Sequence, residues 1–347
     1  MLTLGIETSC DETSAAVIDG DGRVLSNVVS SQMRAHAPYG GVVPEVAARA
    51  HLENLPAVLD AALERAGRRL EDAELVAATA GPGLIGALLV GLSAARGLAF
   101  ARGVPLVGVN HLEGHLFSPF LRPGGEPAQP VKRPFHGLVV SGGHAELVRV
   151  EAHRIVPLAR TRDDAPGEAF DKIARRAGLG YPGGPIVDRL AQRGRGDRFP
   201  FSIGRVHDRS LDFSFSGLKT AMLRELERRR IDGTPLDPET LDPELVDLLA
   251  SFQHAIVAAL LDRVASVHAA GGIRTLALSG GVAANSELRA ALSAWGREHG
   301  VTVLLPDRSF TTDNAAMIAW AGLLAARGGA PTDPAAAVAR SRWPLGT

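Results

Sequence analysis

The chain has 347 residues, of which 46% are hydrophobic, and its 37 lysines and arginines nearly balance its 38 acidic residues. This composition excludes a disordered or low-complexity protein, and the length predicts two domains or one large two-lobed body. The single cysteine, Cys10, excludes an internal disulfide framework and is typical of a reducing compartment, so we expect a cytoplasmic protein.

Neither a secretory signal nor a membrane span is expected. The first residues lack a basic flank and soon reach charged residues. The most apolar long window, residues 84–101, contains Arg96 and several glycines, which predicts a buried helix and not a membrane span.

The first part of the chain alternates strands and helices. Residues 2–7 and 15–19 flank a polar turn and predict a hairpin, and residues 24–31 predict a third strand. Residues 43–67 have helical periodicity, with Pro44 suited to the first turn of a helix. Further along we expect a strand at 75–83 that ends in a tight turn, a helix at 87–103, a strand at 105–110 and a linker at 126–134.

A second hairpin repeats the pattern of the first. Residues 135–140 and 145–151 form two apolar strands around the turn Ser-Gly-Gly-His. A duplicated architecture follows, with the two turns able to face each other across a cleft. Backbone N–H groups in such small-residue turns can bind phosphate oxygens, although one such turn is also compatible with a plain hairpin.

A third glycine turn, in residues 275–292, has the order strand, Gly280-Gly281, helix, with Asn285 or Ser286 near the helix start. This order can place a nucleotide against the backbone and the helix N-terminus. The alternative is an ordinary connection in which Asn285 caps the helix.

Charge is unevenly distributed along the chain. Residues 1–75 contain 6 basic and 12 acidic residues, whereas residues 151–230 contain 17 basic and 11 acidic residues. The basic stretch predicts either contact with a nucleic acid or simply a solvated surface.

His111 and His115, in the sequence His-Leu-Glu-Gly-His, project about 40° apart on a helix and can share a metal ion. The alternative is a packing or surface pair. A zinc peptidase of the gluzincin type needs glutamate directly after the first histidine, where this chain has Leu112. Glu113 lies about 200° around the helix from His111, so a metallopeptidase is disfavoured.

Seven segments together resemble the universal tRNA adenosine threonylcarbamoyltransferase family, called TsaD in bacteria and formerly known as glycoprotease. They read GIETSCDETS, HLEGH, VSGGH, AFDKIARRAGLGYPGGP, FSFSGLKTA, LSGGVAANSELR and TTDNAAMIA, and they occur in this order within a collinear match from about residue 2 to residue 325. The resemblance implies an α/β, actin-like (ASKHA) fold of two ribonuclease-H-like lobes around a nucleotide cleft. Its expected lobes are residues 1–125, completed by a helix at 314–327, and residues 133–312.

The resemblance also implies an activity. Such an enzyme transfers the threonylcarbamoyl group from threonylcarbamoyl-AMP to the N6 amine of adenosine 37, in tRNAs that read codons beginning with adenine, and releases AMP. Its implied partners are tRNA, the paralogous dimerisation partner TsaB and the small ATPase TsaE. An actin-like ATPase or sugar kinase is the main alternative, followed by a non-catalytic nucleotide-dependent scaffold.

The family resemblance assigns roles to individual residues. His111, His115 and Asp313 are implied to bind one divalent ion, with iron(II) favoured and zinc as the alternative. Asp11 and Glu12 are candidates for proton handling, unless they only stabilise their turn. The implied substrate residues are Val140, Ser141, Gly142, Gly143 and His144 for the threonylcarbamoyl-phosphate portion, Asp171, Gly184 and Asp188 for the nucleotide, and Asn285 for the adenine side.

Two of these residues, and two others in the same segments or nearby helices, also have structural interpretations. Without the resemblance, the sequence favours a helix cap for Asp171 and a surface charge for Asp188. Cys10 is expected to be a small buried residue and not a nucleophile, because no histidine lies beside it in the sequence. His51 is expected to be structural or to face a partner.

Overall fold

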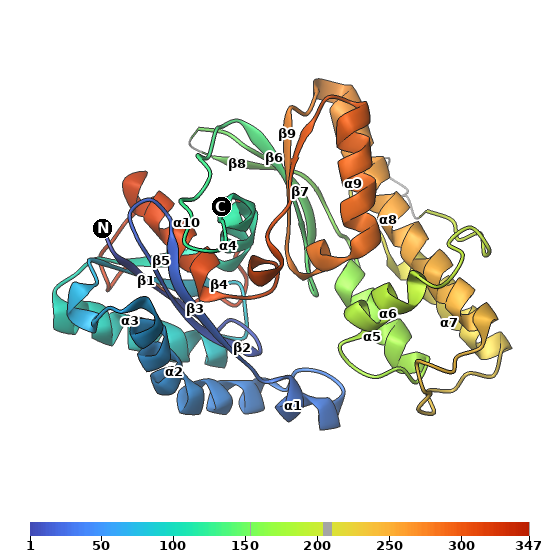
Figure 1. Cartoon of the computed structure of the whole chain (residues 1–347), viewed down its shortest axis with the longest axis horizontal. Coiled ribbons are helices and arrows are strands. Elements are labelled where there is room, and N and C mark those ends of the chain that lie inside the picture. Colours follow the sequence, from blue (N-terminus) through green and yellow to red (C-terminus); the bar gives the residue numbers. More distant parts are fainter. Residues whose placement is uncertain (153, 204–209, 347) are drawn as a thin grey trace. The chain divides into compact units, whose positions relative to one another are not determined.

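The computed structural model describes residues 1–152, 154–203 and 210–346, and the chain divides into two compact units (Figure 1). Unit 1 consists of Met1–Lys132 and Pro306–Thr347, and unit 2 of Arg133–Leu305. Each unit is built on one five-stranded mixed sheet. Unit 2 is therefore continuous in sequence, whereas unit 1 is made from both ends of the chain.

The sheet of unit 1 has the strand order β3-β2-β1-β4-β5. β1 pairs antiparallel with β2 and parallel with β4, so the predicted first hairpin is confirmed. The elements of unit 1 are β1 (Thr3–Glu7), β2 (Glu12–Ile18), β3 (Val24–Ser31), α1 (Met33–His36), η1 (Ala37–Tyr39), α2 (Pro44–Ala66), η2 (Leu70–Asp72), β4 (Leu75–Gly81), α3 (Ile85–Arg102), β5 (Leu106–Asn110), α4 (His111–Phe117), η3 (Ser118–Phe120), η5 (Arg308–Phe310) and α10 (Ala315–Arg327).

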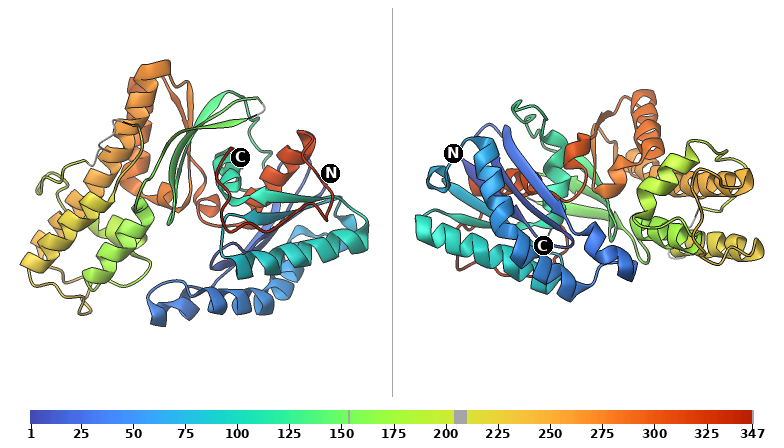
Figure 2. Two further views of the ribbon diagram at one scale, coloured as in Figure 1. Left: turned by 180° about the vertical axis from the view of Figure 1, so that it is seen from behind. Right: turned by 60° about the horizontal axis from the view of Figure 1, so that its bottom comes forward.

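Unit 1 has three layers, with α2 and α3 on one face of the sheet and α10 on the other (Figures 1 and 2). Ile6 of β1 packs in a cluster with residues of α2 and α3. Its neighbour Gly5 points to the opposite face, where a Cβ atom would lie 2.4 Å from the backbone oxygen of Ala315. Glycine at this position lets α10 approach the sheet closely.

Unit 2 repeats the topology of unit 1, with the strand order β10-β9-β6-β7-β8. β6 pairs antiparallel with β7 and parallel with β9, which confirms the second hairpin and the predicted duplication. One apolar cluster joins this sheet to the helices of the unit. The elements are β6 (Phe135–Val140), β7 (Ala145–Val150), β8 (Ile155–Arg160), α5 (Pro166–Arg176), α6 (Gly183–Ala191), α7 (Ser216–Arg228), α8 (Pro243–Gly271), β9 (Thr275–Ser279), η4 (Gly281–Ala284), α9 (Ser286–Glu298) and β10 (Thr302–Leu304).

Two helices in the described part of the chain, α3 and α8, are long and apolar enough to cross a membrane by length and composition alone. The apolar window of α8 is 72% buried inside the structure, as is usual for the core helix of a globular unit. The predicted helix at α3 is confirmed, but only 33% of its apolar window is buried. α3 therefore exposes more apolar surface than the sequence led us to expect.

Candidate metal centre and substrate-binding residues

The two histidines of the His-Leu-Glu-Gly-His segment lie on the short helix α4, which begins directly after β5. Asn110 caps this helix, because its side-chain oxygen accepts a hydrogen bond from the Leu112 N–H at 2.9 Å. At Gly114 a Cβ atom would lie 2.7 Å from Cδ1 of Ile318 in α10. Glycine is disfavoured in helices in general, and here it allows α4 to pack directly on α10.

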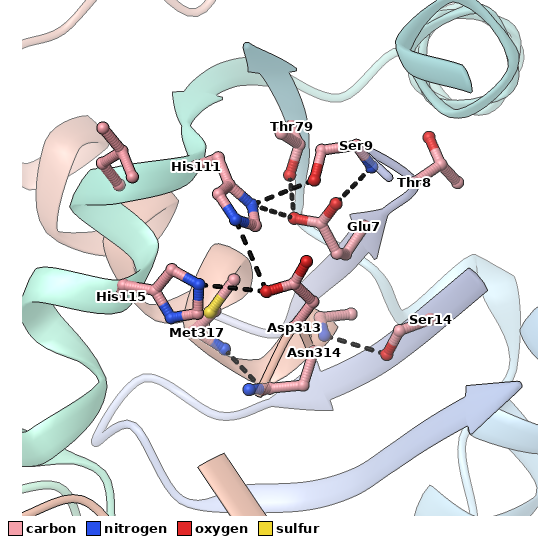
Figure 3. A network of polar contacts seen from close by, with 12 residues as sticks. Glu7, Thr8, Ser9, Ser14, Thr79, His111, His115, Asp313, Asn314 and Met317 are labelled. Carbon is pink, nitrogen blue, oxygen red and sulfur yellow. Dashed lines mark hydrogen bonds and ion pairs between the residues drawn. The ribbon is translucent and has the colours of Figure 1, made fainter. Parts of the chain in front are cut away.

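His111, His115 and Asp313 converge at one point in unit 1 (Figure 3). Oδ1 of Asp313 lies 3.0 Å from Nε2 of His115 and 3.5 Å from Nε2 of His111. All three ligand atoms lie within 4.8 Å of one another. Two imidazoles and one carboxylate with open positions suit either iron(II) or zinc, so these residues fit a divalent ion.

Asp313 is held in place by the start of α10. Its neighbour Asn314 caps α10 by accepting a hydrogen bond from the Met317 N–H at 3.1 Å. The Ala315 N–H donates to Oγ of Ser14 in β2 at 2.9 Å. The carboxylate thus projects from a backbone that is anchored both to its own helix and to the sheet.

Glu7, at the end of β1, is a fully buried carboxylate beside the histidines. It accepts a hydrogen bond from Nδ1 of His111 at 2.9 Å and another from Oγ1 of Thr79 at 2.6 Å, and it also accepts one from the Ser9 N–H (Figure 3). The bond to Nδ1 leaves Nε2 of His111 facing Asp313. This carboxylate–histidine pairing is the usual outer-shell arrangement around a metal-binding imidazole.

The second ring nitrogen of His115, Nδ1, has surroundings that differ from those of Nδ1 in His111. Nδ1 of His115 is buried and has no hydrogen-bond partner among the described residues. Among the described residues, a second carboxylate therefore orients the ring of His111, through Nδ1, but not the ring of His115.

The charges around His111 favour a cation between the carboxylates. Burial lowers the pKa of His111, but Asp313 and Glu7 outweigh burial and raise it well above its usual value. Burial also opposes ionisation of Asp313 and Glu7, yet the neighbouring His111 keeps the pKa of both carboxyls below the usual range. In the metal-free protein the imidazole of His111 therefore carries an additional proton, which a metal ion has to displace when it binds.

Glu12 begins β2, directly after Asp11 in the first hairpin turn. Burial, followed by the charges of Asp313 and Asp11, raises the pKa of Glu12 to about 10. Its carboxyl is therefore protonated at neutral pH in the metal-free protein. Perturbed carboxyl groups of this kind are common where protons are transferred.

Cys10 and His51 serve the structure of the same turn. Burial raises the pKa of the Cys10 thiol, so this residue is not an activated nucleophile. His51 of α2 is fully buried and donates from Nε2 to the Cys10 carbonyl at 3.0 Å. Of the two roles expected for His51, the buried position supports the structural one.

The turn Val140–His144 lies between β6 and β7 of unit 2 and is held by α5. The Ser141 N–H donates to the His144 carbonyl at 2.8 Å, and the Glu168 N–H donates to the Gly142 carbonyl at 3.0 Å. Gly142 and Gly143 are exposed, and a Cβ atom at either would meet nothing within 4 Å. The turn therefore leaves its backbone accessible.

Asp171 and Asp188 support helix N-termini in unit 2. Oδ1 of Asp171 accepts a hydrogen bond from the Gly183 N–H at 2.7 Å, next to Gly184. Oδ1 of Asp188 accepts bonds from Oγ of Ser286 at 2.7 Å and from the Ser286 N–H at 3.1 Å. Asp171 is thus a helix cap, as the simpler interpretation expected, but it caps α6 from a position within α5. Asp188 is not a free surface charge, because its carboxylate accepts hydrogen bonds from Ser286.

Asn285 and Asp188 share a partner that the sequence did not reveal. Asn285 caps α9 through Leu288, as the simpler reading expected, and its Nδ2 donates to Oε1 of Gln253 at 2.7 Å. Nε2 of Gln253 donates to Oδ1 of Asp188 at 3.2 Å. Gln253 is buried in α8 and links two of the residues implied to bind the nucleotide.

Similarity to known proteins identifies the family of this chain. The family model described as "TsaD: tRNA N6-adenosine threonylcarbamoyltransferase" matches residues 23–320. This chain belongs to that family. The threonylcarbamoyltransferase of Synechococcus sp. (strain JA-3-3Ab) is 50% identical over 328 residues, covering 92% of this chain and 86% of that protein. The one from Rhizobium meliloti (strain 1021) is 48% identical over 357 residues, covering 99% and 95% respectively.

Solved structures of lower identity show the fold. HypF of T. kodakarensis matches with a TM-score of 0.60 at 16% identity, over 96% of this chain and 48% of that one. Component A of (R)-2-hydroxyglutaryl-CoA dehydratase from Acidaminococcus fermentans matches with a TM-score of 0.52 at 16% identity, over 94% and 99% respectively. The predicted actin-like fold is confirmed. The protein is a transferase of the tRNA threonylcarbamoyltransferase family, and neither the kinase nor the peptidase alternative is favoured.

Proposed function

We propose that this chain transfers the threonylcarbamoyl group of threonylcarbamoyl-AMP to N6 of adenosine 37 in tRNAs that read codons beginning with adenine. The observation that carries the proposal is family membership over nearly the whole chain together with the convergent His111, His115 and Asp313. In this reaction N6 bonds to the carbamoyl carbon, the bond from that carbon to the phosphate oxygen breaks, and AMP leaves. One N6 proton passes to a base.

The proposed metal ligands are His111, His115 and Asp313, with Glu7 orienting His111. An adenine amine is a poor nucleophile because its lone pair is delocalised, so the carbamoyl group needs activation. A divalent ion at these residues, iron(II) or alternatively zinc, would polarise the carbamoyl group and offset charge on the departing AMP.

Glu12, assisted by Asp11, is the proposed proton-handling residue. Its raised pKa makes its charge sensitive to what binds beside it. A nearby cation favours the ionised carboxylate and lowers the pKa. Glu12 would then be able to accept the N6 proton when metal and substrate are bound.

Unit 2 is proposed to bind the adenylate. The accessible backbone of residues 140–144 would receive the threonylcarbamoyl-phosphate portion, through N–H groups and Ser141. Within the described part of the chain, Oδ2 of Asp188 accepts one bond, from the Ser286 N–H at 3.2 Å, which leaves it able to accept ribose hydroxyls. Asp171 and Gly184 would shape the start of α6 for close approach, and Asn285 would contact the adenine side.

We also propose that TsaB docks on α2 and α3, and that TsaE and tRNA complete the reaction in the cytoplasm. These two helices pack against each other in unit 1. Leu52 of α2 is 67% exposed, and Ile85 and Leu89 of α3 are 49% and 50% exposed. Exposed aliphatic side chains on two helices that pack together favour burial in a protein interface.

The test combines the purified chain with threonylcarbamoyl-AMP, TsaB, TsaE and unmodified tRNA, followed by mass spectrometry of the tRNA nucleosides. Modified adenosine is expected with the natural chain and is expected to be absent after His111→Ala plus His115→Ala. The matched control is Glu113→Gln, a change between the two histidines. Full activity of the double variant, or no product with the natural chain, would contradict the proposal.

A further inference from the structure

The segment that follows α10, residues 331–345, runs along unit 1 and ends beside the helix that carries the two histidines. We call this segment the strap. The Leu106 N–H at the start of β5 donates to the Thr332 carbonyl at 2.9 Å. Further on, Nε of Arg96 in α3 donates to the Pro334 carbonyl at 3.1 Å. The strap is thus bound first to β5 and then to α3.

The strap next crosses the carboxyl end of β4. The Arg340 N–H donates to the Ala80 carbonyl at 2.7 Å, and the Gly83 N–H donates to the Ser341 carbonyl at 3.3 Å. A Cβ atom at Gly81 would lie 2.0 Å from the Arg340 carbonyl oxygen, and Gly81 has a φ of +148°. Only glycine fits there, so β4 is built to receive the strap.

Near its end the strap contacts Asn110, the residue that caps α4. Nδ2 of Asn110 donates to the Trp343 carbonyl at 3.0 Å, while Oδ1 of the same side chain caps the Leu112 N–H. Trp343 is itself held, because its ring packs on the apolar cluster of unit 1 and the Arg340 guanidinium lies 4.9 Å from the ring centroid. Leu345 follows it and is 1% exposed.

Asn110 therefore links the strap to the metal-binding helix. α4 has only 7 residues, too few to be stable by itself, so its orientation depends on its cap and its packing. The bond to Trp343 holds the Asn110 amide with its oxygen toward the helix. The residue after Asn110 is His111, and a small rotation of α4 would separate His111 and His115 from Asp313.

We propose that the strap is a positioning element of the metal centre: the Trp343 carbonyl orients Asn110, and Asn110 orients the histidines of α4. The inference rests on the proposed function only in taking His111, His115 and Asp313 as metal ligands. It assigns a role to residues 331–345, which lie far in sequence from both histidines.

Two variants separate the parts of this linkage. Ending the chain after Arg340 keeps the bond between Arg340 and Ala80 and removes the Trp343 carbonyl, together with the Ser341 carbonyl and the buried Leu345. Asn110→Ser keeps a capping oxygen but removes the amide donor. A chain that ends after Leu345 retains the strap and is the matched control.

The measurement is the Kd for Co(II) and Zn(II), by competition with a chromophoric chelator, together with the visible absorption bands of the Co(II) protein. Each variant is expected to weaken binding about two- to tenfold, the net contribution of one hydrogen bond, since both variants keep an oxygen that caps α4. The combination is expected to be no weaker than either alone, because both break the same linkage. Shifted Co(II) bands are expected in both, since a change in ligand geometry alters them and a loss of stability alone does not.

Unchanged affinity in the shortened chain would overturn the proposal, as would losses that multiply in the combined variant. Should the shortened chain fail to fold, Asn110→Ser alone decides: natural affinity and natural Co(II) bands overturn the proposal. A natural chain that binds no metal would instead overturn the proposed metal centre itself.

Discussion

Replacing Glu7 with glutamine is expected to weaken metal binding about 10- to 100-fold, which is the usual effect of losing an outer-shell partner of a metal-binding histidine. The variant keeps the size of the side chain and removes its charge. Glu7 accepts hydrogen bonds from Nδ1 of His111 and from Oγ1 of Thr79, and both survive only if the glutamine oxygen serves both donors. The NH₂ group of the glutamine would then face the Ser9 N–H. In the natural protein this N–H donates to the other carboxylate oxygen of Glu7.

The expected factor corresponds to about 1.4–2.7 kcal/mol of binding free energy. The loss has two sources: the His111 ring is held less firmly, and its nitrogen becomes less basic without a carboxylate behind it. The natural protein must release the His111 proton when it binds a metal, so its affinity is expected to fall as the pH is lowered.

The assay is anaerobic titration with iron(II), with zinc as a second ion, in competition with a chelator of known affinity. Glu113→Gln is the matched control, because Glu113 lies on α4 itself but is expected to project away from the histidines. A Kd for Glu7→Gln within twofold of the natural value, in a protein with unchanged circular dichroism, would refute the assigned role of Glu7.

Three further changes test the packing of both units and the docking surface. Gly5→Ala should destabilise unit 1 by about 1–3 kcal/mol, because the added methyl group would lie 2.4 Å from the backbone oxygen of Ala315; an unchanged denaturant midpoint would contradict this packing. Asp163→Asn should lower the Tm, because Asp163 accepts bonds from the Ser214 and Ser216 hydroxyls at 2.6 and 2.7 Å at the start of α7. Burial opposes ionisation of Asp163, but these bonds hold its pKa below the usual range, so its stabilisation is present above about pH 4 and is lost as the pH falls through the folded-state pKa. A difference in Tm that does not shrink as the pH is lowered below about 4 would contradict that account. Leu52→Glu should abolish co-elution with TsaB while metal content stays constant, and intact co-elution would move the docking site elsewhere.

Hydrophobic periodicity was enough to predict the paired hairpins and the helices α2 and α3. These elements have regular apolar patterns bounded by glycine or proline, so local sequence specifies them. The pattern gave no prediction for α5 to α8, where charged stretches and loops alternate. α8 is buried over most of its length, and a helix that is apolar on all sides has no amphipathic period to detect.

The site was only partly predictable because its members are distant in sequence. The spacing of His111 and His115 predicts a shared face, and the helix is confirmed. Asp313 came from the family resemblance, since no local pattern links positions about 200 residues apart. Glu7 was missed, although a carboxylate at the end of a five-residue buried strand is a usable signal. Gln253 gave no such signal, because a single polar residue in an apolar helix is uninformative until its partners are known.

The division of the chain has a consequence for biosynthesis. Both histidines precede unit 2 in the sequence, whereas Asp313 and α10 follow it. On the ribosome, unit 2 can therefore fold as a continuous segment while the first 132 residues still lack the helix that covers one face of their sheet. This face of the unit 1 sheet is covered only after unit 2 has been translated, and the three proposed metal ligands come together at that same step. A nascent chain that still lacks the segment after unit 2 would then hold the two histidines without the carboxylate of Asp313, and a metal ion would meet the complete ligand set only after α10 has been made.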